Sequence, residues 1–318
     1  MKPPMTINLS ADICGIKLGN PTILPAGFLG TTKEILKRVA NSGAGAVTIK
    51  SISSVARDGH KNPTVLMYEA GMLNAVGYSN PGVKAAANEF SNIWEIGVPV
   101  IASIIGTEAD GFLEVIDGFG DLLSISKDSS SRFSAIEIPL SCPHTPGFGT
   151  LAGQSTPEAT SKIVSAVRKK CGLPLFVKLS PNVPDISKLA MVAQDAGADA
   201  ITAVNTMGPG MVINIDAREP VLDFKVGGVS GAALRPIAVR CVFDIYKAVE
   251  IPIIGVGGIS SGKDAIEMMM AGASTVGIGT AIYDRGIDVF KGVTDEMSDW
   301  MTNNGVGSLN EIIGAAHK

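Results

Sequence analysis

The chain has 318 residues, 46% of them hydrophobic and 18% charged, which predicts a soluble globular protein with one large domain or two small ones. Its net charge of −4 argues against nucleic-acid binding, which requires a basic patch, and no apolar run approaches the roughly 18 residues of a membrane span. The cysteines lie too far apart for a disulfide framework or a metal or iron–sulfur signature; they are Cys14, Cys142, Cys171 and Cys241.

The first ten residues lack the apolar segment of a signal peptide. Together with the isolated cysteines, this predicts a protein of a reducing compartment, and we expect it in the cytoplasm. Residues 6–9 and 13–18 predict a short N-terminal β-hairpin that turns at residues 10–12.

Eight short apolar runs follow, each with the length and content of a buried strand. Helical patterns separate most of them; Thr32 or Thr31 is a capping residue for the first, and Pro157 occupies the first position of another. The helices are expected at residues 33–42, 81–96, 108–125, 157–170, 186–197, 236–249 and 262–270. The strands are expected at residues 22–27, 46–50, 99–105, 135–140, 174–179, 200–204, 252–256 and 275–278.

A strand–helix unit repeated eight times is typical of an α/β protein whose parallel sheet closes into a (β/α)8 TIM barrel, and the chain has about the usual length. An open doubly wound sheet is the alternative. No linker or change of composition divides the chain, so we expect a single domain over residues 1–318. Residues 51–82 and 207–231 lack clear periodicity and are predicted to be long functional loops.

Polar side chains stand at the C-terminal ends of four predicted strands: Lys50, Cys142, Lys178 and Asn205. In a barrel these ends meet at one mouth, where active sites are built. Cys142 follows a buried strand that Pro143 ends, and a thiol there can act as a base where its surroundings favour the thiolate. Alone, Cys142 is more readily explained as a small buried residue that closes a strand; the convergence favours the catalytic interpretation.

Two glycine-rich segments follow the seventh and eighth predicted strands, at residues 255–258 (GVGG) and 277–280 (GIGT). The loops in these positions commonly bind a phosphate in TIM barrels, because glycine lets backbone N–H groups approach the anion. Tight turns without a ligand are the alternative explanation. A phosphate site here would accept a phosphorylated substrate or a cofactor such as FMN.

With these residues identified, the sequence resembles the dihydroorotate dehydrogenase family, and in particular the FMN-containing catalytic subunit of its NAD-linked, class 1B branch. It is also similar to the pyrimidine-binding domain of dihydropyrimidine dehydrogenase. The resemblance covers nearly the whole chain. Its motifs are residues 71–82 (GMLNAVGYSNPG), 141–143 (SCP), 177–183 (VKLSPNV), 204–206 (VNT), 227–231 (GGVSG) and the two phosphate-loop segments.

The resemblance implies an oxidoreductase of CH–CH bonds that oxidises dihydroorotate to orotate in pyrimidine biosynthesis. Cys142 would take a proton from C5 of the substrate while hydride leaves C6 for flavin N5, with Lys50 as a second catalytic residue. The implied substrate contacts are Lys50, Asn74, Ala75, Val76, Gly77, Tyr78, Asn205 and Thr206. The implied FMN contacts are Ala26, Gly27, Lys50, Ser51, Ser103, Lys178, Val204, Gly231, Gly257, Gly258, Gly279 and Thr280. No metal is expected.

Three positions depart from the family pattern. Pro139 and Ser103 stand where the family has asparagines near the flavin, and His144 replaces a further asparagine. Removing buried amide partners favours an alternative substrate, such as dihydrouracil or another ring. A phosphosugar isomerase or synthase would share the phosphate loops without the thiol and lysines. A binding barrel without activity would explain the lost asparagines but not Cys142.

The resemblance also implies partners. The chain has neither a cysteine cluster nor a dinucleotide fingerprint after its first strand, so electrons from the flavin would leave through another protein. In the NAD-linked branch this is a subunit with FAD and an iron–sulfur cluster. We therefore expect a homodimer or a heterotetramer that acts on a small pyrimidine and binds neither nucleic acid nor membrane.

Overall fold

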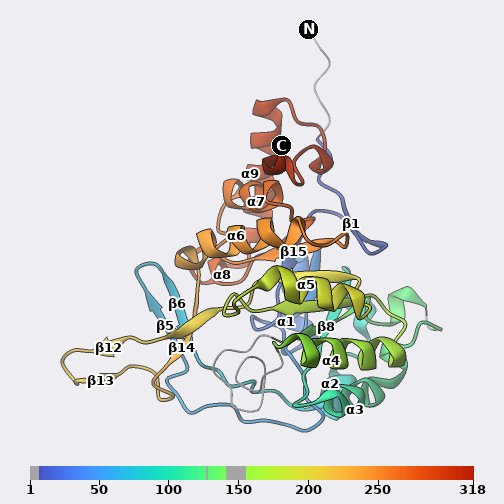
Figure 1. The fold of residues 1–318 in the computed structure, drawn as a ribbon, viewed down its shortest axis with the longest axis vertical. Helices are drawn as coiled ribbons and strands as arrows, with labels where there is room; N and C mark the ends of the chain where they lie inside the picture. The colour runs from blue at the N-terminus through green and yellow to red at the C-terminus, as the bar shows by residue number, and fades with distance from the viewer. Residues whose placement is uncertain (1–6, 127, 141–154) are drawn as a thin grey trace.

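The computed structural model describes residues 7–126, 128–140 and 155–318 (Figure 1). Eight parallel strands form a closed barrel in the order β10-β15-β16-β3-β4-β7-β8-β9. Each coincides with a predicted strand, so the TIM barrel is confirmed and the open doubly wound sheet is excluded. The strands are β3 (Thr22–Leu24), β4 (Ala46–Thr48), β7 (Val100–Ser103), β8 (Ala135–Pro139), β9 (Leu175–Leu179), β10 (Ala200–Ala203), β15 (Ile253–Val256) and β16 (Thr275–Gly277).

The surrounding helices begin where the sequence supplies capping side chains. Thr32 Oγ1 accepts the N–H of Ile35 at the start of α1 (Lys33–Asn41), and Thr156 caps α4 (Pro157–Lys170) in the same way. Buried apolar faces then pack the helices against the barrel. In α5 (Ile186–Asp195) the buried residues are the four expected from helical spacing. Four further helices follow along the chain: α6 (Arg235–Tyr246), α7 (Gly262–Met270), α8 (Ala281–Arg285) and α9 (Val289–Asn304).

Two helices are shorter than predicted. The expected helix at 81–96 is α2 (Val83–Glu89) followed by a separate 3-10 turn, Ile93–Ile96. The one at 108–125 is α3 (Ala109–Phe119), which ends at Gly120 with φ +52°, before the 3-10 turn Gly120–Leu123. Within the described ranges, no helix combines the length and the apolar character that crossing a membrane requires.

The N-terminal hairpin is present, but its predicted turn is wrong. The strands are β1 (Ala11–Ile13) and β2 (Ile16–Leu18), and the chain turns at Cys14 and Gly15, with φ of 53° and 82°. Positive φ at both central residues matches the twist of a two-residue hairpin, and Asp12 Oδ1 accepts the N–H of Gly15 at 2.9 Å. The hairpin places apolar side chains against the N-terminal end of the barrel interior.

The two predicted long loops contain strands, which corrects that expectation. They supply β5 (Val65–Tyr68) and β6 (Gly71–Asn74), then β11 (Met207–Gly210) and β14 (Gly227–Ser230), which pair antiparallel in the order β11-β14-β6-β5. Between the last two, β12 (Ile213–Asn214) and β13 (Glu219–Pro220) form a hairpin that projects away from the barrel (Figure 1). The sheet brings segments from two distant parts of the chain together beside the mouth of the barrel.

Candidate active site

A cavity with two lobes lies at the C-terminal ends of the barrel strands. The first lobe has a volume of about 230 Å³ and reaches the loops after β15 and β16. The second has a volume of about 300 Å³ and lies between the barrel and the four-stranded sheet β11-β14-β6-β5, here called the mouth sheet. Both lobes are lined by Ala26, Phe28, Lys178, Asn205 and Thr206. These shared residues make the lobes one continuous candidate site.

The structure gathers nearly all the predicted site residues around this cavity. The first lobe is lined by Ala26, Lys178, Val204, Gly231, Gly257, Gly258, Gly279 and Thr280. The second is lined by Gly27, Lys50, Ser51, Asn74, Val76, Gly77, Tyr78, Asn205 and Thr206. Ala75 and Ser103 line neither lobe and are fully buried. Cys142 and His144 lie outside the described residues.

The glycine loops leave no room for side chains at the far end of the first lobe. At Gly258, with φ +73°, a Cβ would stand 2.5 Å from the Cβ of Arg235 and 2.8 Å from the carbonyl oxygen of Gly231. At Gly231, with φ +87°, a Cβ would stand 2.7 Å from the Cα of Gly71. Both positions therefore require glycine and expose backbone to the lobe. Such a cradle fits the phosphate group of a cofactor such as FMN.

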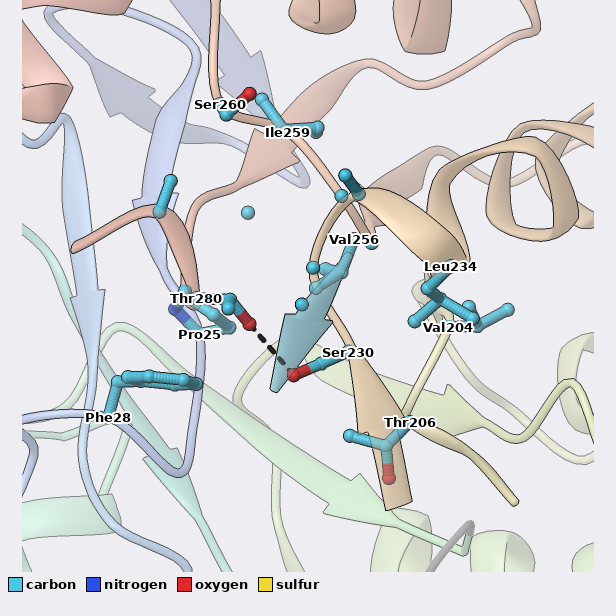
Figure 2. A pocket seen from close by; sticks show the side chains of 18 of the residues that line it. Pro25, Phe28, Val204, Thr206, Ser230, Leu234, Val256, Ile259, Ser260 and Thr280 are labelled. Carbon is cyan, nitrogen blue, oxygen red and sulfur yellow. Dashed lines mark hydrogen bonds between the residues drawn. The ribbon is translucent and has the colours of Figure 1, made fainter. Parts of the chain in front are cut away.

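Side chains around the cradle hold it in place. Thr280 Oγ1 donates to Ser230 Oγ at 2.8 Å, which ties the loop after β16 to β14 (Figure 2). Asp264 accepts hydrogen bonds from both the N–H and the hydroxyl of Ser260 and of Ser261, and it forms an ion pair with Arg235. Neither Ser230 nor Asp264 was among the predicted site residues, although Ser230 lies in the motif at residues 227–231. These contacts link the loops of the cradle to the neighbouring elements.

Beneath the cavity floor lies a layer of buried polar groups. Lys178 on β9 is only 5% exposed and lines both lobes. Ser103 lines neither lobe, and its hydroxyl lies 2.9 Å from that of Ser51, which lines the second lobe. Glu137 on β8 is 3% exposed, accepts a hydrogen bond from Thr202 Oγ1 at 2.9 Å and lies 4.0 Å from Lys178 Nζ. Glu137 was not among the predicted site residues.

The second lobe offers polar groups suited to a small ring. Asn74 Nδ2 donates to the carbonyl oxygen of Gly228 at 3.3 Å, which orients this amide from the mouth sheet. Asn205 Oδ1 accepts the N–H of Thr206 at 2.8 Å. Amide groups held in this way can pair with the alternating donors and acceptors of a pyrimidine edge. Pro139 lines the same lobe and has no polar side-chain atom.

The described cysteines are poor candidates for a catalytic base. Burial, followed by the carboxylates of Asp199 and Asp12, raises the pKa of the Cys14 thiol to about 12. Burial likewise raises the pKa of Cys171 and of Cys241. A thiol with a raised pKa stays protonated at neutral pH.

Comparisons with known proteins agree with the geometry. The dihydroorotate dehydrogenase family model matches residues 8–301. The catalytic subunit of dihydroorotate dehydrogenase B (NAD(+)) from Methanocaldococcus jannaschii is 43% identical over 314 residues, which cover 98% of this chain and 98% of that protein. The same subunit from Methanothermobacter thermautotrophicus is 41% identical over 317 residues, covering 98% of this chain and 100% of that protein.

The fold has a counterpart among solved structures. The crystal structure of the dihydroorotate dehydrogenase of Eimeria tenella in complex with ferulenol matches with a TM-score of 0.83 and 22% identity, covering 100% of this chain and 91% of that chain. That likeness supports the architecture, while the family model and the curated relatives span almost the full sequence. The chain therefore belongs to the dihydroorotate dehydrogenase family.

Proposed function

We propose that this chain catalyses the FMN-dependent oxidation of dihydroorotate to orotate in pyrimidine biosynthesis. The observation that carries the proposal is the two-lobed cavity, with a glycine cradle at one end, amide side chains at the other and a buried lysine at their boundary. A phosphate-bearing cofactor fits the first lobe and a small ring the second. The family to which the chain belongs supports both assignments.

In this proposal the first lobe holds FMN. Backbone N–H groups around Gly258 and Gly279 bind its phosphate, while Lys178 places a positive charge beside the flavin ring. The cofactor supplies the hydride acceptor at its N5 atom. Because Lys178 is buried, its charge acts through a medium of low dielectric constant and stabilises negative charge more strongly than it would in water.

The second lobe binds the dihydropyrimidine. Lys50, Asn74 and Asn205 orient the ring, and the mouth sheet on one side of the lobe helps to exclude water. As the family resemblance implies, Cys142 acts as the base that takes the proton from C5. In the sequence Cys142 stands three residues after Pro139, the last residue of β8, which lines this lobe.

We further infer that electrons leave the site through a second protein. The curated relatives are named as catalytic subunits of an NAD(+)-linked enzyme, which supports an electron-transfer partner carrying FAD and an iron–sulfur cluster. Affinity purification from the native host tests this inference. Co-purification of a flavoprotein that restores NAD+ reduction supports the heteromeric form, and a chain that purifies without such a subunit contradicts it.

A second candidate substrate is supported by one observation. Pro139 lines the substrate lobe without a donor, and Ser103, whose hydroxyl lies 2.9 Å from that of Ser51, lines neither lobe. The site therefore lacks amide groups at both positions, which favours a ring with fewer polar substituents, such as dihydrouracil.

An anaerobic spectral titration of the FMN-loaded protein tests the function. Bleaching of the flavin by dihydroorotate, slowed about 10²- to 10⁴-fold by Cys142→Ala, supports the proposal. Bleaching only by dihydrouracil moves the assignment to the second candidate. A protein that takes up no FMN contradicts both.

A further inference from the structure

A buried carboxylate lies beneath the boundary between the two lobes. Glu137 stands in the middle of β8 and is 3% exposed. Thr202 on β10 donates its hydroxyl to Oε2 at 2.9 Å, while Oε1 has no hydrogen-bond partner within the part of the chain that the structure describes. One oxygen is thus anchored and the other is directed at its nearest cation, Lys178 Nζ, at 4.0 Å.

That distance determines what the pair can do. At 4.0 Å the two groups attract each other strongly in a buried setting, but they do not form a hydrogen bond. An ammonium group has three donors, and this arrangement occupies none of them with Glu137. The carboxylate therefore holds the charge of Lys178 in place and leaves its N–H groups available to a ligand in the cavity. A closer ion pair would use at least one of those donors.

We propose that Glu137 is a positioning residue, anchored by Thr202, which holds the ammonium group of Lys178 at the boundary of the two lobes and moderates the positive potential that bound FMN experiences. The inference rests on the proposed function for the identity of the cofactor. It gives Glu137 a role through Lys178 and not through contact with the substrate.

The midpoint potential of bound FMN is the first measurement. Glu137→Gln keeps the shape of the side chain but removes its charge, so the remaining ammonium stabilises the reduced, more negative cofactor. We expect the equilibrium between oxidised and reduced FMN to shift at least tenfold toward the reduced form, about 30 mV for two electrons. A merely structural role would weaken FMN retention without raising the potential. Thr202→Val should raise the potential less, because it removes only the anchor.

Two further variants control this experiment. Thr275→Val makes the same change at another buried threonine of the barrel, whose hydroxyl has no hydrogen-bond partner among the described residues, and it should leave the potential unchanged. In the Lys178→Met background, Glu137→Gln should no longer raise the potential, because the charge through which it acts is missing. An unshifted potential in FMN-loaded Glu137→Gln, or an equal shift in the Lys178→Met background, overturns the inference.

A cofactor-free measurement separates this inference from the proposed function. Urea unfolding of the apoprotein, of Glu137→Gln, of Lys178→Met and of the double variant forms a double-mutant cycle. We expect at least a tenfold coupling in the unfolding equilibrium constant, because either single change leaves a buried charge without its partner. Additive effects overturn the inference even if FMN binds and is reduced. Failure of the wild-type protein to bind FMN overturns the proposed function, while the cycle still decides whether Glu137 holds Lys178.

Discussion

The two ends of the barrel interior differ although the same strands build both. Near the strand N-termini the interior side chains are apolar and pack against the hairpin β1–β2. Two residues farther along, on five of the eight strands, the side chain is polar or charged and buried. The pairs are Ala46 and Thr48, Ile101 and Ser103, Ala135 and Glu137, Phe176 and Lys178, and Ala200 and Thr202.

This contrast separates two tasks within one sheet. The apolar layer stabilises the fold, because its side chains are removed from water without polar groups that need partners. The polar layer must satisfy each buried group, and it does so incompletely, because Glu137 Oε1 has no hydrogen-bond partner among the described residues. An unpaired buried polar group lowers stability, and such groups are found at sites that bind a charged ligand more often than in layers that only pack.

The largest expected effect is at the apolar end. Phe176 is fully buried in this layer, so Phe176→Ala should lower the free energy of unfolding by about 3–5 kcal/mol, measured by urea denaturation. FMN affinity of the folded protein should change little, because Lys178 and not Phe176 reaches the cavity. Phe176→Leu should cost less. A variant that keeps its stability but loses FMN would contradict the division between the layers.

The next effect is at the cradle. In Gly258→Ala the new Cβ would collide with Arg235 and with the carbonyl of Gly231, so the loop must shift. We expect the dissociation constant for FMN to rise at least tenfold, or about 1.4 kcal/mol, measured by fluorescence titration. Gly286→Ala is the matched control, because Gly286 also has positive φ but no atom within 4 Å of the added Cβ. It should cost about 1–3 kcal/mol of stability without changing affinity. Equal losses of affinity would contradict the assignment of the cradle.

A third prediction concerns the thiol of Cys14. Cys14 lies at the apolar end, and its pKa is raised from 9.0 to about 12 by burial and by Asp199 and Asp12. At pH 8 iodoacetamide should label it at least tenfold more slowly in the folded protein than in urea, followed by peptide mass spectrometry. Because the folded pKa exceeds the unfolded one, the contribution of this thiol to stability is present below pH 9 and is lost toward pH 12. Equal labelling rates would contradict the raised pKa.

The smallest effect concerns an unsatisfied hydroxyl in the barrel. Thr275 is fully buried and its Oγ1 has no hydrogen-bond partner in the described structure. Thr275→Val should raise the free energy of unfolding by about 1 kcal/mol, measured by urea denaturation. Thr202→Val should lower it, because that hydroxyl donates to Glu137. The same Thr→Val change should therefore have opposite effects on stability at the two positions, because only one hydroxyl has a hydrogen-bond partner. A loss of stability in Thr275→Val would contradict this.

The barrel strands could be predicted because each is buried on both faces and reads as a short apolar run. The sheet at the mouth could not, since β11 contains Pro209 and two glycines and β14 begins with two more. Its pairing also joins residues far apart in sequence, such as Leu73 and Val229. The hairpin turn was missed because Cys14 adopts positive φ, which is uncommon for residues other than glycine, asparagine and aspartate.

Site residues at strand ends were predictable for a different reason. Lys178 and Asn205 follow from the rule that strand C-termini meet at one mouth, whatever the details of the loops. Glu137 was missed, although a charged residue in the middle of a buried strand was an available signal. Its partner Thr202 could not be inferred, because the side chains that meet across the interior depend on strand tilt and register.

The closure of the barrel has a consequence for how the protein is made. Seven of the eight strand contacts join strands that follow one another along the chain, but the eighth joins β16 to β3 through Val276 and Thr22. During synthesis β3 can therefore pair with β16 only after almost the entire barrel sequence has been translated. Until then both outer strands present unpaired backbone edges, which are templates for association with other chains. We expect the nascent chain, and not the finished barrel, to be the form most dependent on chaperones.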